Sequence, residues 1–427
     1  MKTGLYDSAV YRRSRTAYVT QCALGYFVTL LVSDAYVAKL LLEAGIDAAT
    51  VGVISTLEQL SCVPALFAIV LEKYEKSAKQ TLMITRALSM FLFAVLYLVP
   101  FVAAARSVRT FLAIIVMFGG HFCLQLTEPE YVKWSYQFVK PDRRSRFSAA
   151  KQMISLLSGV VFTYLIGILF DRYEAVGRLK DVFVPVALMI CAINLLSTVC
   201  LCMMNKDKRG TASVSSGRTM ILKDLKNLFA DRRFLHVVIL TTMFSFGQYL
   251  TNGFMGTYKT VELAFSVGTV QLINAFGFLG RFAISMPLGA YSDRRSYAKG
   301  YTLSLLFMAL AFCAGLVTSP DTRGFIIVYT LLYYFGLAGT GYNTINMCYS
   351  CVSPENMVPA LAIRSCVSGV CAFAASLLGG TIMKVVLRAG NSLFGLPVYG
   401  QQILSFLSLL TVAGAIVYAK KVVEKEL

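Results

Sequence analysis

The chain has 427 residues, of which 57% are hydrophobic and 15% are charged, and its formal net charge is +18. Soluble domains carry about 25% charged residues, so this chain has too little charge to cover the exterior of a water-soluble fold. Its Lys and Arg residues lie in short segments between long apolar runs and do not gather on one face with stacking aromatic side chains. This pattern argues against nucleic-acid binding and favours a membrane protein.

Twelve apolar segments are long enough to cross a bilayer, whose hydrocarbon core needs about 20 residues of α-helix. The first segment follows several basic residues, as in a signal peptide, but it is too long and continues with Asp34 and Lys39 where a cleavage site would stand. We therefore predict an uncleaved first span. The predicted spans are Tyr18–Leu42, Ala49–Leu71, Thr81–Ala103, Phe111–Tyr131, Phe147–Phe170, Val182–Met204, Phe234–Tyr258, Leu263–Tyr291, Gly300–Thr318, Gly324–Tyr349, Val358–Val386 and Tyr399–Ala419.

The basic residues predict how these spans are oriented. Connections on one side carry several Lys and Arg residues each, as in 140–146 and 294–299, whereas the opposite connections carry fewer. Because basic loops stay on the cytoplasmic side, we predict an integral protein of the cytoplasmic (inner) membrane, in contact with its lipids and with both termini cytoplasmic. Residues 205–233 combine a Gly/Ser/Thr-rich stretch with an amphipathic helix, and we expect them to link a bundle of residues 1–204 to one of residues 234–427.

The two halves of the sequence repeat each other at an offset of about 213 residues, as expected for a transporter built from a duplicated unit. Each aligned block begins a span that follows a predicted cytoplasmic loop. The aligned pairs are Pro141 with Pro354, Lys151 with Arg364, Ser155 with Ser368, and Gly167 with Gly380.

A loop in the second half carries a recognisable motif. The sequence Gly289-Ala-Tyr-Ser-Asp293-Arg294-Arg295 resembles the loop motif G-x-x-x-D-R-x-G-R-K/R of the major facilitator superfamily, and residues 68–79 hold a degenerate copy of it. The fifth span has no G-x-x-x-G-P-x-x-G-G pattern, which argues against a drug/proton antiporter of that superfamily. The departures from the loop motif are Ser296, Tyr297 and Ala68.

The resemblance implies an all-α membrane protein with twelve transmembrane helices in two six-helix, pseudo-symmetric bundles. It also implies a secondary active transporter that moves a small solute by alternating access. In the superfamily, the acid of one loop contacts the start of a helix in the other half, which would pair Glu72 with Arg364 and Asp293 with Lys151. We predict that these pairs close the cytoplasmic side. The residues assigned to this gating loop and clasp are Glu72, Lys73, Lys151, Gly289, Asp293, Arg294 and Arg364.

Ionisable residues inside the spans are candidates for binding the solute and a proton, because a charged side chain facing lipid is costly. Asp34 falls in the outer part of the first span, and Glu58 near the middle of the second. In the fourth span, His121, Gln125 and Glu128 recur at i, i+4 and i+7 and so share one helix face. Carboxylates in such places suit reversible protonation, and we therefore predict a proton-coupled cycle.

Two further polar faces occur in the second half, with Gln248 and Asn252 on the seventh span and Tyr333 and Asn343 on the tenth. The resemblance implies that the first, fourth, seventh and tenth spans line a central cavity. We therefore expect these side chains to bind a polar solute near the middle of the membrane. Arg281, in the eighth span, either binds an anionic group or pairs with an acid such as Glu128.

Two alternatives remain open, a cation-coupled sugar symporter of the glycoside type and a membrane sensor with the same fold but no transport. The chain has no Walker-type phosphate loop, so we do not expect it to draw energy from nucleotide hydrolysis. We do not expect an enzyme, because an intramembrane enzyme needs a catalytic pair or metal cluster at helical spacing, and the two histidines, His121 and His236, stand far apart. Cys348 and Cys351 lack the further ligands that zinc needs. The expected partners are a small-molecule solute and a coupling ion, a proton, with no nucleic acid, cofactor or metal, and we expect a monomer.

Overall fold

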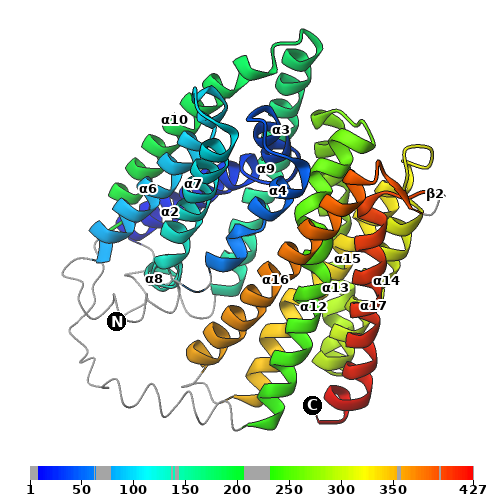
Figure 1. Cartoon of the computed structure of the whole chain (residues 1–427). Helices are drawn as coiled ribbons and strands as arrows, with labels where there is room; N and C mark the ends of the chain where they lie inside the picture. Colours follow the sequence, from blue (N-terminus) through cyan, green and yellow to red (C-terminus); the bar gives the residue numbers. More distant parts are fainter. Residues whose placement is uncertain are drawn as a thin grey trace. The chain divides into compact units, whose positions relative to one another are not determined.

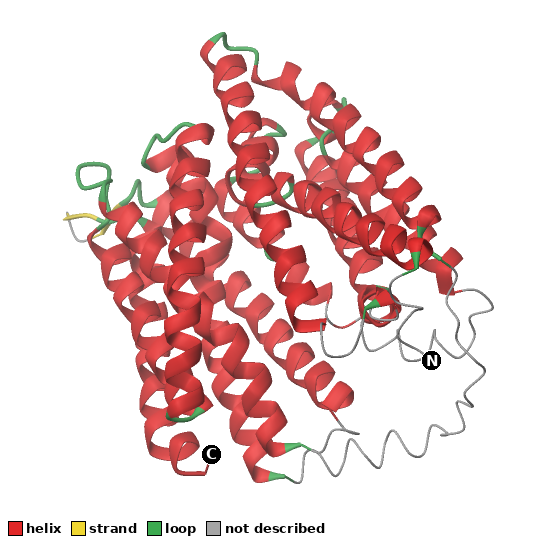
Figure 2. Cartoon of the chain, turned by 180° about the vertical axis from the view of Figure 1, so that it is seen from behind, coloured by secondary structure: helices red, strands yellow, loops and turns green. Residues whose placement is uncertain are grey.

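The computed structural model describes residues 8–61, 63, 78–135, 138–139, 144–205, 231–352, 357–393 and 396–426. These residues are almost entirely helical, as Figure 2 shows, apart from a two-residue pairing of β1 (Ser392–Leu393) with β2 (Leu396–Pro397). The chain forms two compact units. Unit 1 comprises Met1–Asp47, Ser61–Val214 and Ser266–Gln271, and unit 2 comprises Ala48–Leu60, Ser215–Phe265 and Leu272–Leu427.

Unit 1 is a helical bundle in which α2 packs against α9 and α10, and α6 packs against α7 and α10 (Figure 1). Long apolar sequences form these helices because only an α-helix satisfies every backbone hydrogen bond within one membrane-spanning segment. The bounds are α2 Ala9–Leu31, α3 Asp34–Glu43, α6 Ala78–Leu96, η2 Val99–Phe101, α7 Arg106–Leu126, α8 Glu128–Ser135, α9 Arg144–Ala175, η5 Leu179–Val182 and α10 Phe183–Met203.

Unit 2 is a second bundle, in which α12 packs against α16 and α17, and α14 packs against α15 and α17. The short helix α4 also belongs to this unit and contacts α12 and α16. The bounds are α4 Ala48–Ile54, η1 Leu57–Ser61, α12 Arg232–Thr257, η6 Tyr258–Glu262, α13 Val267–Arg294, α14 Tyr297–Val317, α15 Phe325–Cys351, α16 Met357–Arg388, α17 Gly400–Tyr418, η8 Ala419–Val423 and α18 Glu424–Glu426.

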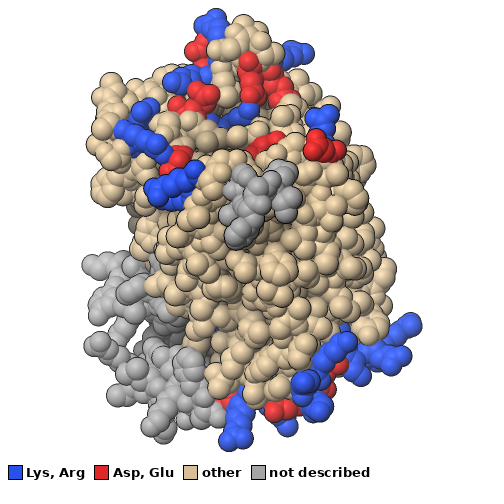
Figure 3. Space-filling view, turned by 45° about the vertical axis from the view of Figure 1, so that its right-hand side comes forward, with Lys and Arg blue, Asp and Glu red and all other residues tan. Residues whose placement is uncertain are grey.

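The surface of the described helices is suited to lipid. Large apolar side chains are exposed along them, including Leu188, Leu195 and Met286, which is 80% exposed. On the face seen in Figure 3, the charged side chains lie near the helix ends and leave the middle of the helices uncharged. Such an exterior suits a hydrocarbon solvent and not water.

Ten described helices are long and apolar enough to cross a membrane, or eleven if α2 and α3 form one bent span. Together with the lipid-facing surface, they make the protein an integral, multi-pass membrane protein. Residues 62 and 64–71 of the predicted span Ala49–Leu71, and the linker residues 206–230, lie outside the described residues. The sequence therefore predicted the helical membrane architecture correctly, although some spans are interrupted.

The first predicted span, Tyr18–Leu42, is wrong as a continuous helix. The chain bends by 48° between α2 and α3. The Ser33 hydroxyl donates a hydrogen bond to the Leu30 carbonyl oxygen at 2.9 Å, which competes with the helical ladder. Asp34 then has a φ of 46°, in the left-handed region that aspartate tolerates better than most residues. Asp34 consequently begins α3 and does not lie within a straight span.

The fourth predicted span, Phe111–Tyr131, is also interrupted. Helix α7 ends at Leu126, and α8 begins at Glu128. Pro129 explains the break, because its ring would clash with the Gln125 carbonyl of a continuous helix and it has no N–H to donate. The prediction that Glu128 shares a helix face with His121 and Gln125 is therefore wrong.

Candidate functional site

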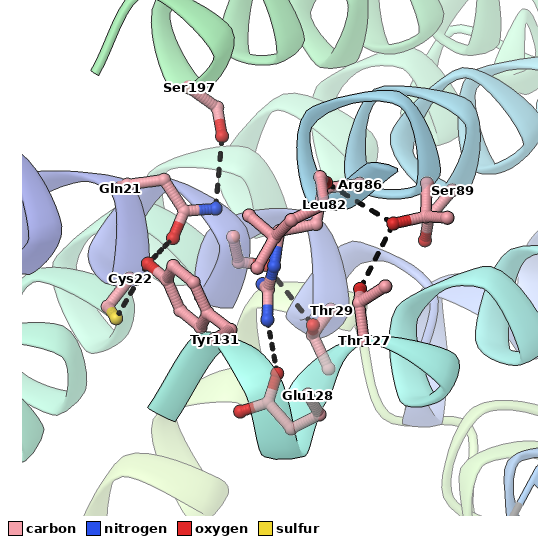
Figure 4. Close-up of polar contacts among 12 residues, drawn as sticks. Gln21, Cys22, Thr29, Leu82, Arg86, Ser89, Thr127, Glu128, Tyr131 and Ser197 are labelled. Atoms are coloured by element: carbon pink, nitrogen blue, oxygen red, sulfur yellow. Dashed lines mark hydrogen bonds and ion pairs between the residues drawn. The ribbon is translucent and has the colours of Figure 1, made fainter. Parts of the chain in front are cut away.

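An ion pair inside unit 1 joins α6 to the start of α8. The Arg86 guanidinium donates to a carboxylate oxygen of Glu128, as Figure 4 shows. The Arg86 side chain is 7% exposed, whereas the Glu128 side chain is 44% exposed. The helix break before Pro129 places Glu128 at the beginning of α8, where the helix dipole favours a negative charge.

Tyr131 connects this ion pair to α2 and α10. The guanidinium carbon of Arg86 lies 3.7 Å from the centroid of the Tyr131 ring. The Tyr131 hydroxyl donates to the Gln21 side-chain oxygen, and the Gln21 amide donates to the Ser197 hydroxyl at 3.2 Å (Figure 4). Gln21, Arg86, Glu128, Tyr131 and Ser197 are called the arginine–glutamate cluster below. It links four helices through charged and polar side chains.

A second cation lies close to this cluster. The Lys151 ammonium, on α9, is 5.5 Å from the centroid of the Tyr18 ring on α2. The Tyr18 ring in turn lies against the Tyr131 ring, with centroids 4.9 Å apart. Lys151 and Arg86 therefore lie over two neighbouring aromatic rings, an arrangement that each cation–π contact stabilises by about 0.5–2 kcal/mol.

His121 and Gln125 are not among the residues whose contacts define the arginine–glutamate cluster. His121 is 2% exposed and packs edge-on against Phe93 of α6, with ring centroids 5.0 Å apart. Gln125 is partly buried near the end of α7. The structure therefore places His121 in the packing between α6 and α7 and joins Glu128, from the same predicted stripe, to Arg86.

Unit 2 contains a separate polar network on α12 and α15. The Gln248 side-chain amide donates to the Tyr333 hydroxyl at 2.9 Å, and that hydroxyl donates to the Asn252 side-chain oxygen at 3.0 Å. Gln248 and Tyr333 are buried, whereas Asn252 is exposed. Gln248, Asn252 and Tyr333 are called the glutamine–tyrosine cluster below. The structure brings together these three residues, which the sequence placed on two separate helix faces.

Glu58 lies in the same unit, in the 3-10 helix η1, and its side chain is exposed. It is close enough to interact electrostatically with Tyr249, whose hydroxyl also has a hydrogen bond with the side chain of Gln59. Tyr249 also interacts electrostatically with Tyr333, so Glu58 lies near the glutamine–tyrosine cluster.

Asn343 and Arg281 do not form part of either cluster. Asn343 is completely buried beside Gly300 of α14, and its amide atoms have no hydrogen-bond partner among the described residues. Arg281 is partly buried on α13. The acid proposed as its partner, Glu128, is paired with Arg86 instead.

The predicted gating residues are only partly described. Glu72 and Lys73 lie outside the described residues. A Cβ added at Gly289 would meet no described atom within 4 Å outside its own helix backbone and chain neighbours. Asp293 and Arg294 are exposed, and the Tyr342 hydroxyl donates to Asp293 at 2.9 Å. The Arg364 guanidinium donates to Ser365 at 2.7 Å. Both clasp pairs remain predictions.

Arg86, Tyr131 and Gln21 are functional candidates that the sequence interpretation missed. Arg86 was recognisable as a charged residue inside the third predicted span, and Pro129 as the cause of a helix break. Gln21 and Tyr131 gave no comparable signal, because their importance depends on the packing of α2 against α8. Among the described residues, no group of three or more His, Cys, Asp or Glu side chains could hold a metal ion.

Comparison with known proteins identifies the fold. Residues 22–382 match the model of the Major Facilitator Superfamily. A mutant of the nucleoside transporter NupG is similar in structure, with a TM-score of 0.73, 13% identity and coverage of 96% of this chain and 99% of that one. A D-xylose-proton symporter gives a TM-score of 0.71, 12% identity and coverage of 96% and 97%.

A third similar structure is a bacterial homologue of the iron transporter ferroportin, with a TM-score of 0.66, 14% identity and coverage of 96% and 98%. At these identities the similarity concerns the fold alone. Comparison with curated protein sequences gave no match.

Proposed function

Since the chain belongs to the major facilitator superfamily, we propose that it is a proton-coupled secondary active transporter of a small polar solute. It works by alternating access in the cytoplasmic membrane, with both termini in the cytoplasm. Glu128 is the group that binds the coupling proton. The glutamine–tyrosine cluster supplies uncharged hydrogen-bonding groups for the solute.

The ion pair between Arg86 and Glu128 is the observation that carries this proposal. The carboxylate is about half exposed and can exchange a proton, whereas the guanidinium is almost completely buried. Protonation of Glu128 would leave the Arg86 charge buried without its counter-ion, which costs free energy. A conformation that gives Arg86 water or a new anionic partner would then be favoured. Proton binding can thus shift the equilibrium between conformations.

The glutamine–tyrosine cluster supports a polar solute. The Tyr333 hydroxyl both accepts and donates a hydrogen bond, and Asn252 presents an exposed amide beside it. Such groups suit hydroxyl, amide or ring-nitrogen groups of a solute. Two proteins with the same fold, a nucleoside transporter and a D-xylose-proton symporter, agree with a polar solute, and the second also agrees with proton coupling.

Uptake into liposomes tests the proposal. The purified protein is reconstituted and offered sugars, nucleosides, amino acids, organic anions and organic cations under an inward proton gradient, an inward sodium gradient or no gradient. We expect at least one solute to accumulate under the proton gradient and to leave when a protonophore is added. Accumulation that requires sodium would favour the glycoside-type alternative. Binding without uptake under any gradient would favour a sensor and contradict the proposal.

A further inference from the structure

The charges around the arginine–glutamate cluster do not balance. Among the side chains that the structure describes there, Arg86 and Lys151 are cationic, and Glu128 is the one carboxylate. Two more cations lie nearer the helix ends and donate to backbone carbonyls, Arg15 to Phe138 and Lys79 to Cys202 and Met204. This part of unit 1 therefore has an excess of positive charge on its described side chains.

Lys151 is the cation that lacks an acidic partner among the described side chains. Its described contact is with the Tyr18 ring, and it is partly buried. It stands seven residues after the start of α9, about 10 Å along the helix at 1.5 Å per residue. A partly buried ammonium is costly unless an anion compensates it. An aromatic ring supplies part of that compensation.

Lys151 and Arg86 are close enough to act on the same part of the bundle. Both interact electrostatically with the Cys22 thiol, which lies 3.5 Å from the Tyr131 hydroxyl. The two rings beneath the cations are in contact with each other. Figure 4 shows Arg86, Tyr131, Glu128 and Cys22 converging from α2, α6 and α8. A carboxylate entering this region meets one cation already paired and another that has no acidic partner among the described side chains.

We propose that the solute is a small organic carboxylate and that Lys151 and Arg86 bind its anionic group. This inference rests on the proposed transport function and names the solute class. Lys151 attracts the carboxylate, and protonation of Glu128 releases the Arg86 guanidinium, whose paired N–H groups match the two oxygens of a carboxylate. One proton and one carboxylate together leave the net charge of the cluster unchanged, so the coupled step is electroneutral.

This assignment gives Lys151 a different role from the clasp predicted by the sequence. In the clasp, Lys151 would pair with Asp293 and would not bind the solute. The described contacts favour binding, because Lys151 is partly buried over Tyr18, whereas exposed Asp293 already accepts a hydrogen bond from Tyr342. The Asp293→Asn variant is therefore expected to keep its affinity for carboxylates.

Equilibrium binding to the detergent-purified protein tests the inference without requiring transport. The probes are matched pairs of a carboxylate and its neutral amide, benzoate with benzamide and lactate with lactamide, measured by thermal shift and calorimetry at pH 5.5 and 7.5. We expect at least one carboxylate to bind, more tightly at pH 5.5, and its amide to bind at least about tenfold more weakly. Equal affinity for acid and amide, or no binding of either carboxylate, would overturn the inference.

Lys39 offers a matched control, because it is a lysine of the same unit that is already paired with an acid, Glu174. Lys151→Gln is expected to weaken carboxylate binding at least about tenfold, whereas Lys39→Gln leaves it unchanged and Lys151→Arg retains it. Unchanged affinity in Lys151→Gln would contradict the inference. If Lys151→Gln does not fold, loss of binding in Lys151→Met with an unchanged melting temperature supports the inference, and retained binding contradicts it.

The result also separates the two proposals. Carboxylate binding without uptake into liposomes would contradict the transport function and would still support the carboxylate-binding site. Proton-driven uptake of a neutral solute, with no carboxylate bound, would contradict the carboxylate-binding site and would still support the transport function.

Discussion

Arg86 and Glu128 form an ion pair whose two side chains differ sharply in exposure, 7% for the arginine and 44% for the glutamate. The two residues are therefore not equivalent when one of them is removed. A glutamate left alone can be hydrated, whereas an arginine left alone remains buried against Tyr131. This asymmetry makes Glu128 the member of the pair whose protonation changes the free energy of the fold.

The asymmetry predicts the outcome of a double-mutant cycle. Glu128→Gln leaves a buried, uncompensated guanidinium and is expected to lower the free energy of unfolding by about 1–3 kcal/mol. Arg86→Met keeps most of the side-chain volume and is expected to cost less. The double variant should be more stable than Glu128→Gln alone, with a coupling free energy of about 1–2 kcal/mol. Unfolding in detergent measures all four proteins, and a double variant less stable than either single variant would contradict the account.

The Tyr333 hydroxyl gives a second prediction. Tyr333→Phe removes the acceptor of the buried Gln248 amide, which then lacks that partner, and is expected to cost about 1–3 kcal/mol of stability. Asn252→Ala removes the other end of the network, but Asn252 is exposed and water can replace it, so its cost should stay below about 0.5 kcal/mol. Thermal unfolding compares the two variants. Equal losses would show that the hydroxyl is not what holds Gln248.

Close packing of α4 on α12 gives a third prediction. A methyl group added at Gly253 would lie against the Gly52 carbonyl oxygen and 2.6 Å from the Thr56 methyl carbon, and it could not move away because the backbone fixes the position of Cβ. Gly253→Ala is therefore expected to destabilise this packing by about 1–3 kcal/mol.

Gly341 is the matched control for that substitution, because it is also helical and, apart from its own helix backbone and chain neighbours, no described atom lies within 4 Å of an added Cβ. Gly341→Ala should be neutral or slightly stabilising, by up to about 1 kcal/mol, since alanine is the better helix former. Thermal unfolding of both variants measures the difference. A loss of stability in Gly341→Ala as large as in Gly253→Ala would contradict the packing argument.

Much of the fold could be predicted from the sequence, because hydrophobic length alone determines where a helix can cross a membrane. The predicted span Val182–Met204, for example, coincides closely with α10, Phe183–Met203. The interruptions of the helices were harder to predict from the sequence. Pro129 indicated one of them. The bend before Asp34 involves a hydrogen bond from the Ser33 hydroxyl to the Leu30 carbonyl oxygen, and serine makes such bonds at many positions without interrupting a helix.

The candidate sites were predictable to a smaller degree. Gln248, Asn252 and Tyr333 were recognised on their helix faces, and the structure joins them because α12 and α15 bring those faces together. Glu128 was recognised as an ionisable residue within a span, but its partner was not. Helical periodicity relates residues on one helix, whereas Arg86 lies on a different helix and its pairing depends on tertiary packing.

Liposomes that contain a pH-sensitive dye measure whether Glu128 couples proton movement to solute movement. Addition of a transported solute outside should acidify the lumen with the unmodified protein. Glu128→Gln should abolish this acidification while retaining exchange of labelled for unlabelled solute. Glu174→Gln, which removes an acid of similar exposure (39%) from its ion pair with Lys39, should behave like the unmodified protein. Solute-dependent acidification that persists in Glu128→Gln would contradict the account.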